Sequence, residues 1–133
     1  MRDPQCERIY NWEDEWKAWN VGSLTLPACR TLVRAACDLY DVRYPSVLQH
    51  RNMELSYYDP NAARISLRPD HKNAAIALHE AAHHIIWEGY HDTVEDHGVE
   101  WLRVYLHLLI EFGVAPEIAL RATLIKHGLE WPE

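Results

Sequence analysis

The chain has 133 residues, of which 48% are hydrophobic and 25% charged; these values are ordinary for one folded soluble domain and too apolar for a disordered chain. The net charge of −7 argues against a broad nucleic-acid-binding face, because such a face needs clustered Lys and Arg. No apolar run reaches the roughly 18 residues of a membrane helix, and residues 1–7 lack the apolar stretch of a signal peptide. We therefore expect a single domain over residues 1–133 that binds neither a membrane nor a nucleic acid.

The cysteines indicate a reducing compartment. Cys29 and Cys37 fall in one predicted helix, where a separation of eight residues corresponds to about 12 Å, beyond the reach of a disulfide. With Cys6 the set is odd, and the absence of a C-x-x-C pair argues against a cysteine zinc site. We interpret all three as small buried side chains of a cytoplasmic protein.

Residues 1–41 are predicted to form an N-terminal helical part. A first helix over about residues 7–20 carries three tryptophans on one stripe, Trp12, Trp16 and Trp19. The simpler interpretation is that this stripe packs on the body of the domain, and the alternative is a surface that docks a partner. After a break at residues 22–25, a second helix begins at Pro27 and runs to about residue 40. Its expected buried face comprises Leu32, Ala35, Ala36 and Leu39.

Period-two alternation then predicts a small, mostly antiparallel sheet of three strands. The first strand lies within residues 43–51, with Pro45 near its start. The second, residues 53–58, places Met53, Leu55 and Tyr57 on one face. The third, residues 63–68, sets Ala63, Ile65 and Leu67 against Arg64, Ser66 and Arg68. The turn-forming run at residues 59–61 makes the last two strands a hairpin.

From residue 70 onward the pattern is helical. Asp70 is expected to cap a helix that runs to Glu88, is apolar nearly all round and is therefore buried. Gly89 is its expected C-terminal stop. A second helix over residues 96–112 completes a metal-site core that spans residues 43–112.

The C-terminal part, residues 113–133, is predicted to hold one helix that starts at Pro116 and ends before Gly128. The side chains expected to face inward are Ile118, Leu120, Leu124 and Ile125. Together these elements predict an α+β fold with N-terminal helices, a small sheet, a central helix and two C-terminal helices.

The predicted central helix contains His79-Glu80-Ala81-Ala82-His83, an H-E-x-x-H pattern. His79 and His83 are four residues apart, so both imidazoles leave one face of the helix and can bind one zinc ion. Glu80 lies about 100° further round the helix, where its carboxylate can take a proton from a water on that ion. Burying two histidines and a glutamate without a metal would be costly, which favours metal binding.

A catalytic zinc site needs a third protein ligand and leaves the fourth position to water. His97 is the best candidate, because residues 89–95 can span up to roughly 23 Å and return the chain to the metal at the first turn of the next helix. His91 in the loop and Glu100, one turn beyond His97, stay open as alternatives. His84 is expected to point away from the shared face.

The stretch 79–109 resembles the core of the SprT-like zinc metallopeptidases. Members of that family share H-E-x-x-H, a short connection, and then a histidine followed by glycine, two further residues and an aromatic residue. Here that second part reads His97-Gly98-Val99-Glu100-Trp101, and with the preceding strands the resemblance covers about residues 43–112. It implies a zincin-like fold and peptide-bond hydrolysis with Glu80 as the general base. The zinc ligands that it implies are His79, His83 and His97.

Two features of the sequence restrict the kind of metallopeptidase that the chain resembles. Larger SprT-like proteins carry a zinc-ribbon or other DNA-binding extension, for which this chain lacks the cysteines and the basic region. The chain is therefore nearer to the short stand-alone versions found in bacteria and their viruses. The zincin class defined by H-E-x-x-H-x-x-G-x-x-H is excluded, because Ile86 and Gly89 stand where it needs glycine and histidine.

We expect a protein or peptide substrate to lie extended along an edge strand at residues 63–68, held by backbone pairing. The donor that would stabilise an oxyanion is left open among Tyr105, Tyr57, Tyr58, Tyr90 and His91. Side chains of the strand itself are either a solvated face or contacts for acidic substrate segments: Arg64, Ser66 and Arg68.

Two other functions stay open. The chain can be a metal-stabilised interaction module in which zinc clamps two helices and the tryptophan stripe docks a partner. It can also be a regulatory peptidase of the repressor-cleaving type, which shares the H-E-x-x-H helix and the small size. A site with three protein ligands and a water favours an enzyme, because structural zinc sites are closed by four.

Overall fold

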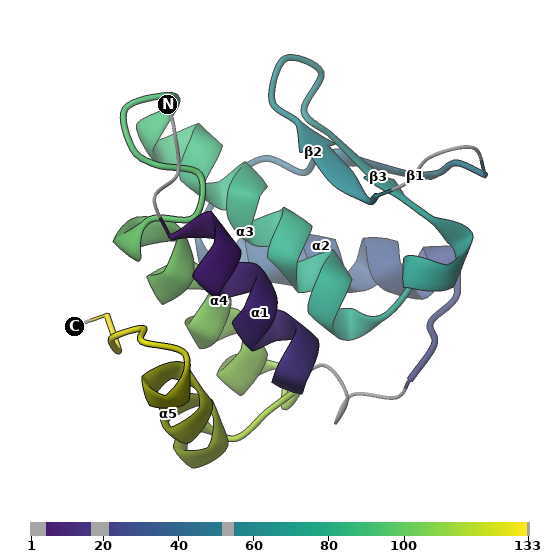
Figure 1. Ribbon diagram of the computed structural model, residues 1–133. Coiled ribbons are helices and arrows are strands. Elements are labelled where there is room, and N and C mark those ends of the chain that lie inside the picture. Colours follow the sequence, from purple (N-terminus) through teal and green to yellow (C-terminus); the bar gives the residue numbers. More distant parts are fainter. Residues whose placement is uncertain (1–4, 17–21, 52–54, 133) are drawn as a thin grey trace.

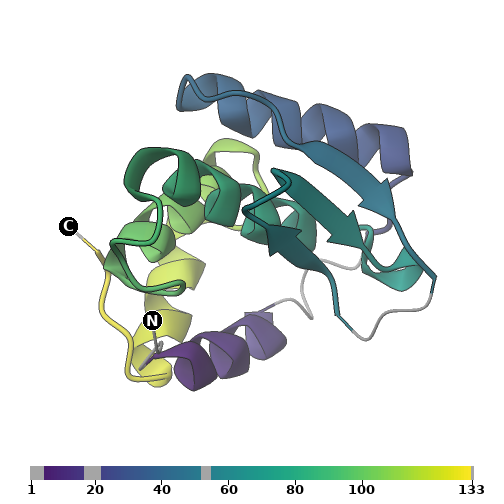
Figure 2. The ribbon, with the colours of Figure 1, turned by 90° about the horizontal axis from the view of Figure 1, so that it is seen from above.

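The structure, a computed structural model, describes residues 5–16, 22–51 and 55–132 (Figure 1). Within these residues the fold is α+β, as predicted, with five α-helices and a three-stranded sheet. Helix α3 (Ala74–Tyr90) lies at the centre of the molecule (Figure 1). Seen from above, α1 (Cys6–Trp16) and α2 (Leu26–Leu39) lie on opposite sides, with α3 and the sheet between them (Figure 2).

The sheet has the order β1-β3-β2, formed by β1 (Ser46–Gln49), β3 (Arg64–Leu67) and β2 (Tyr57–Asp59). The expected hairpin is confirmed, because β2 pairs antiparallel with β3. The other pair, β1 with β3, is parallel, so the sheet is mixed rather than mostly antiparallel. Since β3 is central, the prediction that residues 63–68 form an edge strand is wrong, and β2 is the edge on that side.

The two strands of the hairpin also face differently from the predicted pattern. Leu55 and Tyr57, which form the apolar face of the predicted second strand, are 69% and 48% exposed. Ser56 and Tyr58 face the body of the protein instead, where the Ser56 hydroxyl accepts a hydrogen bond from the Arg68 amide at 3.0 Å. On β3 both faces are covered, so Ser66, expected on the outer face, is fully buried. Residues 53 and 54 of the predicted second strand lie outside the described residues.

Helix α1 packs against α5 (Glu117–Lys126). Trp12 and Trp16 are fully buried, and the Trp12 indole donates a hydrogen bond of 2.9 Å to the Thr123 hydroxyl. These two side chains therefore belong to the core, and the alternative that they dock a partner is wrong. Trp19 lies outside the described residues.

Helix α2 begins where the sequence predicts, because the Thr25 side chain accepts a hydrogen bond from the Ala28 amide at its N-terminus. Its buried face is rotated from the predicted one. Leu39 is 46% exposed, and the fully buried side chains are Cys29, Val33, Ala36 and Cys37. No cysteine in the described residues forms a disulfide.

Helix α3 starts and ends differently from the prediction. Its cap is Asn73, whose side chain accepts a hydrogen bond of 2.9 Å from the Ile76 amide. Asp70 instead lies in a short 3-10 helix (η2, Pro69–His71) and pairs with Arg68. The helix continues through Gly89 to residue 90, and its C-cap is His91, which has a positive φ of +53°.

Helix α4 (Val99–Glu111) begins after Gly98, later than predicted, and the chain leaves it through Gly113 at φ of +68°. On α5 the expected inward residues divide, because Leu120 and Leu124 are buried whereas Ile118 and Ile125 are 80% and 75% exposed. None of the helices in the described part of the chain combines the length and the apolar stretch that crossing a bilayer requires.

Candidate metal centre

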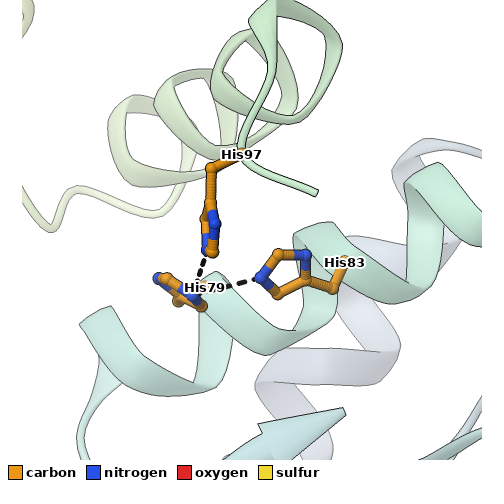
Figure 3. Close-up of side chains that lie close together, drawn as sticks. All are labelled: His79, His83 and His97. Atoms are coloured by element: carbon orange, nitrogen blue, oxygen red, sulfur yellow. Dashed lines mark hydrogen bonds between the residues drawn. The ribbon is translucent and has the colours of Figure 1, made fainter. Parts of the chain in front are cut away.

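Three histidines converge on one point beside helix α3 (Figure 3). His79 and His83 come from one face of α3, and His97 comes from the loop just before α4. The Nε2 atom of His79 lies 3.2 Å from Nε2 of His83 and 3.4 Å from Nε2 of His97. Among the described residues, this is the group of His, Cys, Asp and Glu side chains that lies close enough to hold a metal ion.

The spacing of the ring nitrogens fits a tetrahedral metal ion. Zinc binds histidine nitrogen at about 2.0–2.1 Å, so two ligands at a tetrahedral angle lie roughly 3.3 Å apart. Both measured nitrogen–nitrogen distances, 3.2 and 3.4 Å, agree with this value. Burial, together with the neighbouring His79 and His97, holds the pKa of His83 well below its ordinary value. His83 is therefore neutral at neutral pH, which is the form that binds a metal.

The alternatives for the third ligand lie elsewhere. His97 is 5% exposed and precedes the N-cap of α4, rather than lying in the helix's first turn. His91 is exposed beside the same cleft, and neither it nor Glu100 belongs to the converging group in the described residues. His84 turns away, as predicted, and lies 2.8 Å from the Tyr58 hydroxyl and 2.7 Å from the Arg43 carbonyl oxygen.

Trp101 packs against the rings of all three histidines. Its fully buried indole stacks on His83 at 5.2 Å between ring centroids. It also meets His79 and His97 edge-on, at 4.8 Å in each case. One rigid side chain on the first turn of α4 thus contacts all three imidazoles, which restricts the orientations that their rings can take.

Helix α1 supplies residues that the sequence analysis missed. Glu13 is buried and its carboxylate lies 2.7 Å from Nδ1 of His79. Gln5 donates a hydrogen bond of 2.6 Å to the His97 carbonyl, and the ring of Tyr10 lies 5.3 Å from that of His97. A signal was available in the sequence, because Glu13 follows Trp12 and shares the buried side of α1 with Trp16.

A cleft of about 730 Å³ opens onto the three histidines. Its walls come from α1, from the segment around β2, from α3 and from the loop before α4. Glu80, 5% exposed, lines it beside His79 and His83. Tyr10 also lines the cleft, and burial, together with a hydrogen bond to Cys6, raises the pKa of its hydroxyl above the ordinary value.

Some residues predicted for the site lie outside the cleft. Tyr105 is fully buried behind His79, with its hydroxyl 3.2 Å from the Glu13 carboxylate and 3.1 Å from the Ala75 carbonyl oxygen. Of the other predicted contacts, Tyr57, Tyr58 and His91 line the cleft. Those that do not are Arg64, Ser66, Arg68 and Tyr90.

The charge on the cleft wall is negative. Apart from Glu13 and Glu80, the described lining residues include four carboxylates, Asp14, Asp92, Glu95 and Asp96, and no Lys or Arg. The expectation that strand residues such as Arg64 and Ser66 bind acidic segments therefore finds no support in the position of these residues.

Comparison of the chain with models of known protein families, with curated proteins and with solved structures finds no match.

Proposed function

We propose that this protein is a zinc metallopeptidase, with His79, His83 and His97 as the zinc ligands and Glu80 as the general base. The observation that carries the proposal is that the three converging imidazoles and the Glu80 carboxylate line one open cleft. A structural zinc site is closed by four protein ligands. In the described residues the converging group has three, which leaves room for a water.

The chemistry divides between the ion and the chain. A zinc ion held by the three histidines supplies a Lewis acid that polarises a carbonyl and acidifies a water. Glu80 accepts the proton at its carboxylate and delivers it to the leaving amine. The edge strand β2 lies along the same cleft and can pair with an extended peptide backbone, which replaces β3 in the role expected from the sequence.

The resemblance to the SprT-like metallopeptidases supports the proposed activity, because it implies the same zinc ligands and the same general base. Two residues that carry the resemblance have a physical role in the structure, since Gly98 is the N-cap of α4 directly after His97 and Trp101 packs against the three imidazoles. A Cβ at position 98 would lie 3.2 Å from the Glu95 Cβ, so glycine suits that tight corner.

The acidic wall supports a substrate with positive charge near the scissile bond. The four carboxylates outside the metal centre come from α1 and from the loop before α4, so they face the cleft from two elements. A cationic peptide segment would gain from this field, whereas an acidic one would be repelled.

Metal analysis and two matched variants test the function. The wild-type protein is expected to contain about one zinc per chain, and His97→Ala to lose it. Glu80→Gln is expected to keep zinc and lose cleavage of an unstructured, lysine-containing protein. His107→Ala is the control, because this exposed histidine of α4 does not line the cleft and its variant should keep both zinc and activity. Cleavage by Glu80→Gln at the wild-type rate would refute the general-base role.

A further inference from the structure

We propose that Glu13 is a positioning residue of the metal centre and that metal binding is therefore coupled to the docking of helix α1. The inference rests on the metal binding in the proposed function and is independent of peptide hydrolysis. It assigns a role to a helix that the H-E-x-x-H pattern does not include.

The contact between Glu13 and His79 determines which ring nitrogen is available. Nδ1 of His79 lies 2.7 Å from the carboxylate, a distance at which the ring N–H donates to the carboxylate oxygen. With Nδ1 protonated, Nε2 carries the lone pair, and this is the atom that faces His83 and His97. A carboxylate behind a metal-binding histidine fixes its tautomer and ring orientation and raises its basicity.

The carboxylate is itself held in place. The Glu13 side chain is 1% exposed, and the oxygen that contacts His79 also lies 3.2 Å from the Tyr105 hydroxyl of α4. Tyr105 in turn lies 3.1 Å from the Ala75 carbonyl of α3. A carboxylate buried among apolar groups is costly unless charged or hydrogen-bonding partners offset its desolvation. A metal ion bound at Nε2 of His79 would add positive charge on the other side of the ring and so favour the buried carboxylate.

The same helix also contacts the third histidine. Gln5, just before α1, donates a hydrogen bond to the His97 carbonyl at 2.6 Å, and Tyr10 packs edge-on against the His97 ring. His79 and His97 belong to different elements, so α1 bridges the two segments that the metal joins. By linkage, an ion that binds the assembled arrangement better than the open one must also stabilise the docked helix.

The first experiment measures zinc affinity by competition with a chelator. Glu13→Gln, which is nearly the same size, is expected to bind zinc roughly 10- to 100-fold more weakly than the wild type. Glu7→Gln is the matched control, since Glu7 is exposed on the same helix and does not line the cleft. It should keep wild-type affinity. Unchanged affinity in a folded Glu13→Gln protein would overturn the proposal.

A second pair of measurements separates positioning from a purely structural role. Tyr105→Phe keeps the ring and removes the hydroxyl that contacts Glu13, so a smaller loss of zinc affinity is expected. Zinc should also slow amide hydrogen exchange in residues 6–16 of the wild type, and less so in Glu13→Gln. If Glu13→Gln does not fold, the test rests on the zinc affinity of Tyr105→Phe and on amide exchange in the wild type. The inference is overturned if Tyr105→Phe binds zinc as tightly as the wild type and zinc does not slow exchange in residues 6–16. If the wild type binds no zinc, the proposed function fails as well.

Discussion

The indole of Trp101 is stacked on the imidazole of His83, with ring centroids 5.2 Å apart and an interplanar angle of 23°. With its edge contacts to His79 and His97, the same indole touches all three histidines. Its indole N–H also points at the His79 carbonyl, 3.4 Å away. Trp101, four positions after His97, therefore holds the three imidazoles of the metal centre in place.

Replacing Trp101 should weaken both the fold and the metal centre. Trp101→Ala removes a fully buried indole and leaves a cavity, which costs about 3–5 kcal/mol of unfolding free energy. Trp101→Phe keeps an aromatic ring under His83 and should lose less. Urea unfolding of the metal-free proteins measures the first effect, and chelator competition measures zinc affinity. Trp87→Phe is the control, because Trp87 lines the cleft and packs on His91 rather than on the three histidines. Equal zinc affinity in folded Trp101→Ala would contradict this account.

The N-terminus of α3 allows a test of two competing caps. Asn73→Ala should cost about 1 kcal/mol, because it removes the side-chain acceptor of the Ile76 amide. Asn73→Asp retains an acceptor and should lose little. Asp70→Ala should shift the urea midpoint less than Asn73→Ala does, since Asp70 pairs with Arg68 at the surface. The opposite order of the two alanine variants would mean that Asp70 is the functional cap.

The histidines could be placed from sequence because their geometry is local. Two of them share one helix face at a fixed spacing, and the third follows after a loop long enough to return the chain to the metal. The same argument explains why His84 was expected to point elsewhere, which the structure shows. What this local reasoning missed is Glu13, whose partner lies 66 positions further along the chain. The sequence could predict that Glu13 lies on the buried side of a tryptophan-rich helix, but not that it contacts His79.

The sheet shows where local patterns are insufficient. Alternation identified the hairpin, yet the position of β1 beside β3 is set by long-range pairing that a single strand's sequence does not encode. The same holds for side-chain direction, because the alternation puts Leu55 and Tyr57 on one face but does not show that this face is exposed. On α5, Ile118 and Ile125 fit a helical stripe, but the face that packs on Trp12 is the one that carries Thr123.

The buried cysteines should be unreactive in the folded protein. Burial raises the pKa of Cys37 from about 9 to about 12, with a smaller contribution from Asp38, and burial raises the pKa of Cys29 as well. At pH 8 a disulfide reagent should modify Cys6, at the half-buried start of α1, and reach Cys29 and Cys37 only on unfolding. Fast labelling of Cys37 in the folded state would contradict the structure.

The same shift gives a pH dependence with a defined sign. Above about pH 9 the unfolded chain loses its Cys37 proton while the folded chain keeps it until about pH 12. The unfolded state then binds fewer protons, so the unfolding free energy falls as pH rises through this window. Cys37→Ser or Cys37→Ala should reduce that slope in urea unfolding at pH 8 to 10. An unchanged slope would show that this thiol does not carry it.

The acidic wall predicts a preference that can be measured without turnover. Glu80→Gln is expected to bind substrate without cleaving it, so its affinity for two peptides that differ only in Lys or Glu beside the central bond reports the field of the cleft. The Lys peptide should bind roughly 3- to 30-fold more tightly at low salt, and the ratio should shrink at 0.5 M salt, where the Debye length is only about 4 Å.

Neutralising Glu95 and Asp96 together (E95Q, D96N) should reduce the ratio of the two affinities, because both residues line the cleft beside His97. Neutralising Glu117, which lies on α5 outside the lining, is the control. Tighter binding of the Glu peptide, or a ratio that salt does not change, would show that the carboxylates do not select the substrate.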